Sequence, residues 1–198
     1  MSDLAAEIPA LTDDEGAFLA LVVRAQPATA YQLLRICDQS PVTNVGTSKG
    51  KVYPLIHRLK SRGFLASKPV SGDARRSEWL VSTDEGEKAV RGWIKGLKPN
   101  HLLPEDALRI KFQSFHLLSK TEQWEWLCGA EMALKGKLRE LLFHPDPFTG
   151  PYNDLVLDSA ITAVRSRLDW LARVRSRLMS ELDPPEGAST AERNYSRP

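Results

Sequence analysis

The stretch GKVYPLIHRL, residues 50–59, decides the fold expected for this 198-residue chain. Its apolar residues recur at the i, i+3, i+4, i+7 spacing that buries one stripe of an α-helix, at Val52, Leu55, Ile56 and Leu59. Gly63 follows, and glycine suits the left-handed position just after a helix. The pattern therefore predicts a helix that starts near Thr47 or Ser48, ends at Gly63 and turns a polar, basic face outward.

Two more helices are expected before this one, and a hairpin after it. Thr12 with Glu15, and Thr29 with Gln32, have the three-residue spacing of a capping box, and each pair precedes an apolar helical pattern. Residues 64–70 and 77–82 are short and β-compatible, with a turn at 71–74 between them. A third capping box, at residues 82–85, opens a fourth helix that ends near Gly96.

This order of helix, helix, helix, hairpin and helix is that of a winged helix-turn-helix. The second half has helical patterns at residues 104–118, 121–143 and 157–182. The fold class is therefore mainly α with a small β-hairpin, a winged helix-turn-helix followed by an α-helical dimerisation domain. The expected ranges are an arm at 1–10, the winged domain at 11–99, the helical domain at 100–182 and a disordered tail at 183–198.

The charge of the chain is concentrated on the expected third helix and hairpin. Twenty-seven Lys and Arg against twenty-five Asp and Glu give a net charge of only +2. Residues 47–79, however, carry eight basic and two acidic residues, a local charge of +6. Such a concentration favours binding to DNA phosphates, whose neutralisation releases counterions. The predicted DNA-binding residues are Thr47, Ser48, Lys49, Lys51, Tyr53, His57, Arg58, Arg75 and Arg76.

Within this set the residues have different expected roles. Thr47 and Ser48, with the helix amides behind them, form a phosphate clamp. Arg75 and Arg76 at the hairpin tip would reach a neighbouring backbone or the minor groove. Two alternatives stay open: the basic face is a solvated helix surface, or Tyr53 packs at the domain edge instead of contacting DNA.

Residues 50–59 followed by Gly63-Phe64-Leu65 resemble the recognition-helix signature of the PadR family of bacterial transcriptional regulators. Tyr31-Gln32-Leu33 is similar to a Tyr-Glu-Leu element of that family, and Arg75-Arg76 and residues 82–86 resemble its wing and its strand-to-helix junction. The chain departs from the family at Ser82, where Leu or Tyr is usual. The resemblance covers residues 18–93.

The resemblance implies a homodimeric repressor that binds a palindromic operator and responds to an aromatic small molecule between its domains. An apolar seam in the last helix is the candidate dimerisation surface. Its predicted residues are Leu157, Ile161, Val164, Leu168, Leu171 and Leu178. The alternative is that this seam packs inside one chain.

Trp93 and Trp124 are the candidate effector-pocket residues, and the alternative is that both are ordinary core or interface aromatics. Cys37 and Cys128 lie in apolar helical patterns, which suits reduced core thiols better than redox sensors. His101, His116 and His144 have no metal-ligand spacing.

The sequence has no Walker loop, G-x-S-x-G or H-E-x-x-H motif, so we expect neither an enzyme nor a bound cofactor or metal. It contains no apolar run long enough to span a membrane and no secretory signal, which predicts a cytoplasmic protein. The alternative function is a winged-helix module that docks an acidic protein partner and binds no DNA.

Overall fold

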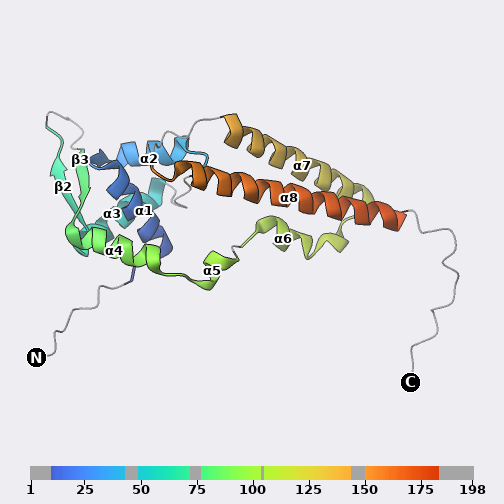
Figure 1. The fold of residues 1–198 in the computed structure, drawn as a ribbon, viewed down its shortest axis with the longest axis horizontal. Coiled ribbons are helices and arrows are strands. Elements are labelled where there is room, and N and C mark those ends of the chain that lie inside the picture. The colour runs from blue at the N-terminus through green and yellow to red at the C-terminus, as the bar shows by residue number, and fades with distance from the viewer. Residues whose placement is uncertain (1–9, 43–48, 72–76, 104, 144–149, 183–198) are drawn as a thin grey trace, which may run out of the picture. The chain divides into compact units, whose positions relative to one another are not determined.

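The computed structural model describes residues 10–42, 49–71, 77–103, 105–143 and 150–182, and Figure 1 shows its helices and strands. The chain forms two compact units. The first comprises residues 1–109 with 145–153, and the second comprises residues 110–144 with 154–198. The predicted arm, except Ala10, and the predicted tail lie outside the described residues.

The first unit has the element order expected of a winged helix. The predicted succession of three helices, a hairpin and a fourth helix is confirmed, and a one-turn helix follows at Pro99–Leu102. The helices are α1 (Asp13–Ala25), α2 (Ala30–Gln39), α3 (Lys49–Ser61), α4 (Asp84–Lys95) and α5 (Pro99–Leu102). The strands are β1 (Ala28–Thr29), β2 (Leu65–Pro69) and β3 (Glu78–Ser82).

The hairpin strands belong to an antiparallel sheet of three strands in the order β1-β3-β2. Leu65 of β2 lies opposite Ser82 of β3, and Pro69 lies opposite Glu78. The predicted two-stranded sheet was incomplete, because β1 pairs Ala28 with Leu80 on the other side of β3. A strand of two residues has no alternating pattern by which a sequence could reveal it.

Two of the three predicted capping boxes are confirmed, at Thr12 with Glu15 and at Thr29 with Gln32. The third is wrong by one residue: Thr83, and not Ser82, caps α4, and its hydroxyl accepts a hydrogen bond from the Gly86 amide at 3.0 Å. Ser82 belongs to β3, where its amide and hydroxyl donate to Gln26 Oε1 at 2.7 and 2.9 Å. Its hydroxyl is therefore already engaged in the sheet.

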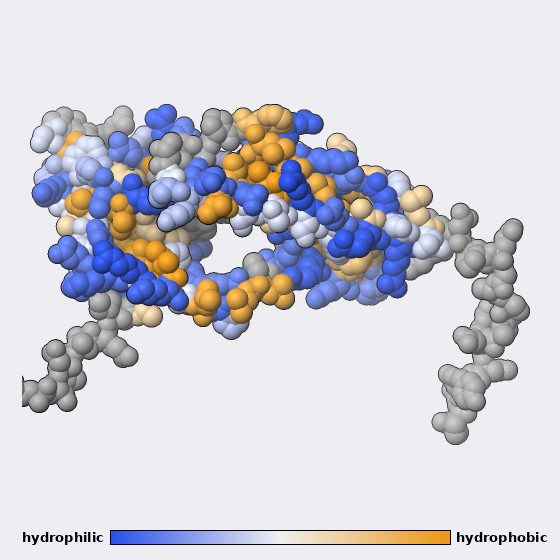
Figure 2. Space-filling model, viewed as in Figure 1, coloured by the Kyte–Doolittle hydropathy of each residue, from blue (hydrophilic) through white to orange (hydrophobic). Residues whose placement is uncertain are grey.

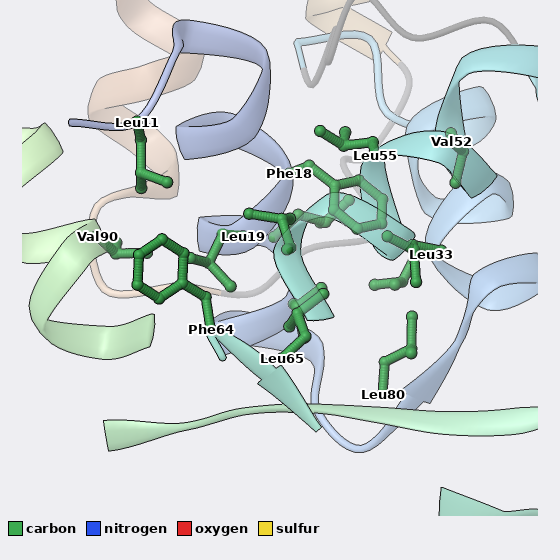
Figure 3. Packing of buried hydrophobic residues seen from close by; sticks show 14 of the residues in the cluster. Leu11, Phe18, Leu19, Leu33, Val52, Leu55, Phe64, Leu65, Leu80 and Val90 are labelled. Carbon is green, nitrogen blue, oxygen red and sulfur yellow. The ribbon is translucent and has the colours of Figure 1, made fainter. Parts of the chain in front are cut away.

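The buried stripe of α3 anchors the first core, as Figure 3 shows. Its four predicted residues are all buried, and they pack with Phe18 and Leu19 of α1, Leu33 of α2 and Leu80 of β3. Gly63 then ends the helix with a positive φ of 74°, the left-handed conformation expected there. The opposite side of α3 is thereby fixed as a surface.

The second unit is built on α7 (Lys120–Phe143) and on α8 (Asn153–Leu182), whose first residue belongs to the first unit. The helix predicted at 104–118 is shorter: α6 covers Ala107–Phe112 and a 3₁₀ turn covers Phe115–Leu117. Gln123 Nε2 of α7 donates to the carbonyls of Phe115 and Leu118, both at 3.1 Å, which satisfies the backbone at this break. Leu127 and Leu171 pack with Phe115 in the core of this unit.

Candidate DNA-binding face

The outward side of α3 carries four of the predicted DNA-binding residues. Lys51, Tyr53, His57 and Arg58 are exposed, and Tyr53 keeps 65% of its surface open to solvent. Lys49 is the first residue of α3, but its side chain is not among those described. Thr47, Ser48, Arg75 and Arg76 lie outside the described residues. The structure thus brings together, on one helix face, the predicted residues whose side chains it describes.

An ion pair joins α3 to the sheet beside this face. Lys60 Nζ lies 2.8 Å from Glu78 Oε2 at the start of β3. The hydrogen bond from Lys60 holds the pKa of Glu78 below its ordinary value. Glu78 therefore stays ionised and paired, so its charge is partly neutralised next to a surface that would meet phosphates.

Tyr31, at the start of α2, lies beside the face and was not among the predicted DNA contacts. Tyr31 and Tyr53 are both largely exposed, and together they line a hollow of about 260 Å³. The other residues of the hollow come from α2, α3 and the β1–β3 edge: Thr29, Ala30, Ile56, Ser77, Glu78 and Leu80. The sequence signal for Tyr31 was the Tyr31-Gln32-Leu33 element, which supported only the family resemblance and was not used to predict a DNA contact.

Two acidic residues in the first turn of α1 make contacts that sequence reasoning also missed. The Glu15 carboxylate is buried and accepts from Arg62 Nη1 at 2.8 Å and from Arg58 Nε at 3.5 Å. Asp13 accepts from Trp93 Nε1 at 3.2 Å and from Lys98 Nζ at 2.8 Å. The sequence could have predicted the burial of Glu15. Phe18, Leu19 and Val22 follow it by three, four and seven residues, which places Glu15 on the buried side of α1.

The contacts of Asp13 tie α1 to the segment that follows α4. Besides Lys98, Asn100 Nδ2 donates to Asp13 at 3.3 Å, and His101 Nε2 lies 3.3 Å away. The hydrogen bonds from Lys98, Trp93 and Asn100 hold the pKa of Asp13 well below its ordinary value. The chain that leaves the winged domain is therefore held against the N-terminus of its first helix.

The predicted dimer seam is partly covered within one chain. Val164 and Leu171 are buried, with exposed fractions of 6% and 2%. Leu157, Ile161, Leu168 and Leu178 are half-buried. Most of the seam residues therefore have neighbours inside this unit already, which is the alternative that the sequence left open; their part in a dimer stays a prediction.

Other apolar side chains of the second unit remain open to solvent. They gather at the end of α7 and the start of α8, where Figure 2 shows a hydrophobic area. Phe143 is 75% exposed, and three more apolar residues at these two helix ends are exposed: Leu142, Leu155 and Val156. A hydrophobic area that is open to solvent marks an interaction site more often than a scatter of single apolar residues does.

The two candidate effector tryptophans lie in different units. The Trp93 ring packs so closely on α1 that a Cβ at Gly16 would lie 2.3 Å from it, and its indole nitrogen donates to Asp13. Trp124 is 43% exposed, and the Arg175 guanidinium lies 5.6 Å from the centre of its ring. Their contact with an effector stays a prediction.

A hollow of about 320 Å³ lies in the second unit, and neither candidate tryptophan lines it. Phe112 and Trp170 form its aromatic part, with ring centres 5.2 Å apart in an edge-to-face arrangement. Two arginines and two apolar residues complete the lining: Arg173, Arg177, Val174 and Leu178. Aromatic and apolar side chains beside two arginines suit a small molecule with an aromatic ring and an acidic group.

Cys37 and Cys128 are free thiols, and both are half-buried rather than in the core; Cys37 packs against the core of the first unit. Burial, and then the neighbouring Asp38 carboxylate, raises the pKa of the Cys37 thiol, which disfavours the reactive thiolate. Among the described residues, no three His, Cys, Asp or Glu side chains are grouped as a metal site. In the same part of the chain no helix combines the length and the apolar character needed to cross a membrane.

No protein-family model and no curated protein matches the chain in sequence. Solved structures do match it in fold. Bacillus subtilis PadR in complex with operator DNA is 19% identical and has a TM-score of 0.68, over 83% of this chain and 98% of that one. The PadR-like transcriptional regulator BC1756 from Bacillus cereus is 14% identical, with a TM-score of 0.65 over 86% and 98% of the two chains.

Bacillus subtilis PadR in complex with p-coumaric acid is 18% identical and has a TM-score of 0.64, over 85% of this chain and 99% of that chain. These similarities extend over nearly the whole length of the solved chains. The described part of this chain combines a winged helix, a three-stranded antiparallel sheet and a C-terminal helical region. It therefore has the fold of the PadR transcriptional regulators.

Proposed function

We propose that this chain is a DNA-binding transcriptional regulator of the PadR family. One observation carries the proposal: the buried stripe of a winged helix fixes α3 so that Lys51, Tyr53, His57 and Arg58 all face solvent. In helix-turn-helix proteins the corresponding helix enters the major groove of DNA. The fold shared with a regulator solved on operator DNA supports the same assignment.

The residues of this face have different proposed roles in DNA binding. Lys51 and Arg58 supply positive charge for phosphates or for the acceptor atoms of guanine, and Tyr53 and His57 supply hydrogen bonds to base edges or to the backbone. The predicted contacts at Thr47, Ser48, Lys49, Arg75 and Arg76 would extend this surface along the groove and to the neighbouring backbone.

A homodimeric repressor that binds a palindromic operator is the form we propose for the intact protein. Two-fold symmetric operators require two copies of the reading helix at a fixed spacing. The exposed apolar residues at the end of α7 and the start of α8 offer a surface for the partner, next to the partly covered seam. A Phe143→Glu substitution should shift the mass measured by light scattering to that of one chain, whereas an unchanged mass would place the interface elsewhere.

An aromatic small molecule with a negative charge is the effector that we propose for this regulator. The hollow lined by Phe112, Trp170, Arg173 and Arg177 offers rings for stacking and cations for an acidic group. The solved complex of a PadR protein with p-coumaric acid supports this class of compound. Titration with p-coumaric acid should quench the fluorescence of Trp170, and a Trp170→Phe variant should lose that part of the signal. A Trp79→Phe variant, changed in β3 of the first unit, should keep it.

The experiment that tests DNA binding is selection of duplexes by the full chain from a random pool at about 50 mM salt. We expect enrichment of a two-fold symmetric sequence. Its affinity should fall by about 10³-fold between 50 and 200 mM salt if six or more phosphates are contacted. No enrichment at low salt would contradict the proposal and favour the alternative, a module that docks an acidic protein partner.

A further inference from the structure

The buried carboxylate of Glu15 joins the first helix to the recognition helix. Its Oε2 atom accepts from Arg62 Nη1 at 2.8 Å, and its Oε1 atom accepts from Arg58 Nε at 3.5 Å. Only 7% of the Glu15 side chain is exposed, against 24% for Arg62 and 55% for Arg58. One acidic residue therefore connects a core position of α1 with an arginine of the candidate DNA-binding face.

Glu15 remains ionised in these surroundings. Burial raises its pKa. The hydrogen bond from the Thr12 amide, the charge of Arg62 and the hydrogen bonds from Arg62 and Arg58 outweigh burial, so the pKa of Glu15 lies below the ordinary value. A buried ion pair adds little net stability compared with apolar packing, because both charges lose their hydration. Its main contribution here is geometric, since it fixes where the arginine side chains lie.

The contact with Glu15 uses Arg58 in a way that leaves most of its donors for another partner. Arg58 meets the carboxylate through Nε, the guanidinium nitrogen nearest to the main chain. Both Nη groups, with four of the five N–H donors of the guanidinium, remain outside this contact. A guanidinium held through Nε can present its Nη edge to a phosphate or to the O6 and N7 atoms of guanine.

We propose that Glu15 is a positioning residue for DNA recognition: it contacts no DNA, and it holds Arg58 so that the Nη groups meet the operator. This inference rests on the proposed function of the chain. Glu15 also offsets the charge of Arg62, which limits attraction to arbitrary DNA. Loss of the carboxylate should therefore weaken binding to the operator while binding to unrelated DNA stays the same or strengthens.

Glu15→Gln separates this role from that of Glu15 in the capping box. Glutamine can still accept the hydrogen bond from the Thr12 amide, as Gln32 does from Thr29 at 2.8 Å in the second box of this chain. The substitution removes the charge but keeps the cap. Glu85→Gln is the matched control, because Glu85 also lies in the first turn of a helix, α4, and pairs with Lys88 of that same helix. The substitution removes one acidic charge and leaves the contacts of Arg58 unchanged.

The test measures affinity by fluorescence polarisation for the selected operator duplex and for a scrambled duplex of equal length. Glu15→Gln should lower the ratio of the two affinities by about tenfold, the effect of one lost base contact. Glu85→Gln should leave the ratio unchanged. In an Arg58→Ala background, Glu15→Gln should have no further effect on the ratio.

Two results would overturn the inference: an unchanged ratio in Glu15→Gln, or a loss of equal size with and without Arg58. Either would mean that Glu15 has only a structural role. A wild-type chain that binds no duplex would instead overturn the proposed function itself, so the two failures are distinguishable.

Discussion

Replacement of Gly86 by alanine should destabilise the winged domain, because the start of α4 lies against the backbone that follows α3. A Cβ at Gly86 would lie 2.2 Å from the Phe64 carbonyl oxygen and 3.1 Å from its carbon. The distance of 2.2 Å between this Cβ and the Phe64 oxygen is about 1 Å shorter than a Cβ contact in a real protein can be. The Phe64 carbonyl cannot easily retreat, since it accepts from the Thr83 amide at 3.1 Å while the Thr83 hydroxyl donates to the Gly63 carbonyl at 2.6 Å.

The expected cost follows from these contacts. Overpacking costs about 1–3 kcal/mol, and each weakened hydrogen bond costs about 1 kcal/mol. The better helix propensity of alanine returns about 1 kcal/mol. With both hydrogen bonds of Thr83 weakened, the net loss should be about 2–4 kcal/mol, which lowers the melting temperature of a domain of this size by roughly 10–30 °C.

Gly92→Ala is the matched control on the same helix. No atom lies within 4 Å of a Cβ at Gly92, so alanine there should raise stability by about 0.5–1 kcal/mol. Differential scanning calorimetry of the full chain measures both variants. If Gly86→Ala melts at the wild-type temperature or above it, the close approach of α4 to Phe64 is refuted.

Three further outcomes are expected. Leu171→Ala should lower the free energy of unfolding of the second unit by about 2–5 kcal/mol, and Leu155→Ala, at an exposed position, by less than about 0.5 kcal/mol; equal effects in urea titrations would contradict the packing of α7 on α8. The lowered pKa of Asp13 contributes stability that is present above the ordinary pKa of 3.8 and is lost as the pH falls below it. Asp13→Asn should therefore make stability less dependent on pH in acid unfolding, which circular dichroism measures. An unchanged acid-unfolding profile would contradict this. Arg75→Ala combined with Arg76→Ala should weaken DNA binding without changing the mass by light scattering, and a loss of the proposed dimer would instead show that the wing assignment is wrong.

Local features of the fold were predictable because neighbouring residues determine them. The buried stripe of α3 repeats with the helical period, and Thr12 and Thr29 have their capping partners three residues away. Gly63 follows the stripe, and glycine is the residue type that suits a positive φ. Each of these signals lies within a few residues of the structure it specifies.

Features that depend on distant contacts could not be predicted in the same way. Strand β1 forms because Ala28 and Thr29 pair with β3. Thr83 caps α4 in place of Ser82, because Ser82 is hydrogen-bonded to Gln26, 56 residues earlier in the chain. The ion pairs of Glu15 join residues 43 and 47 positions apart. The period of α1 could place Glu15 on the buried side, but it could not name its partners.

The same difference applies to the candidate site. The outward direction of Lys51 and His57 follows from the buried stripe of their own helix, so the sequence sufficed for it. The hollow beside Tyr31 and Tyr53 needed the packing of α2, α3 and β3, and the hollow with Phe112 and Trp170 needed that of α6 on α8. Pockets form between elements, and a single helical period carries no information about them.

The central claim is that the outward face of α3 binds duplex DNA, and charge reversal on that face tests it most directly. Lys51→Glu and Lys111→Glu change the net charge equally, and both lysines are exposed, but only Lys51 lies on α3. In polarisation titrations with the selected duplex, the account predicts that Lys51→Glu weakens binding by about 100-fold or more, while Lys111→Glu changes it by less than about threefold. Equal affinities of the two variants for the duplex would contradict the claim.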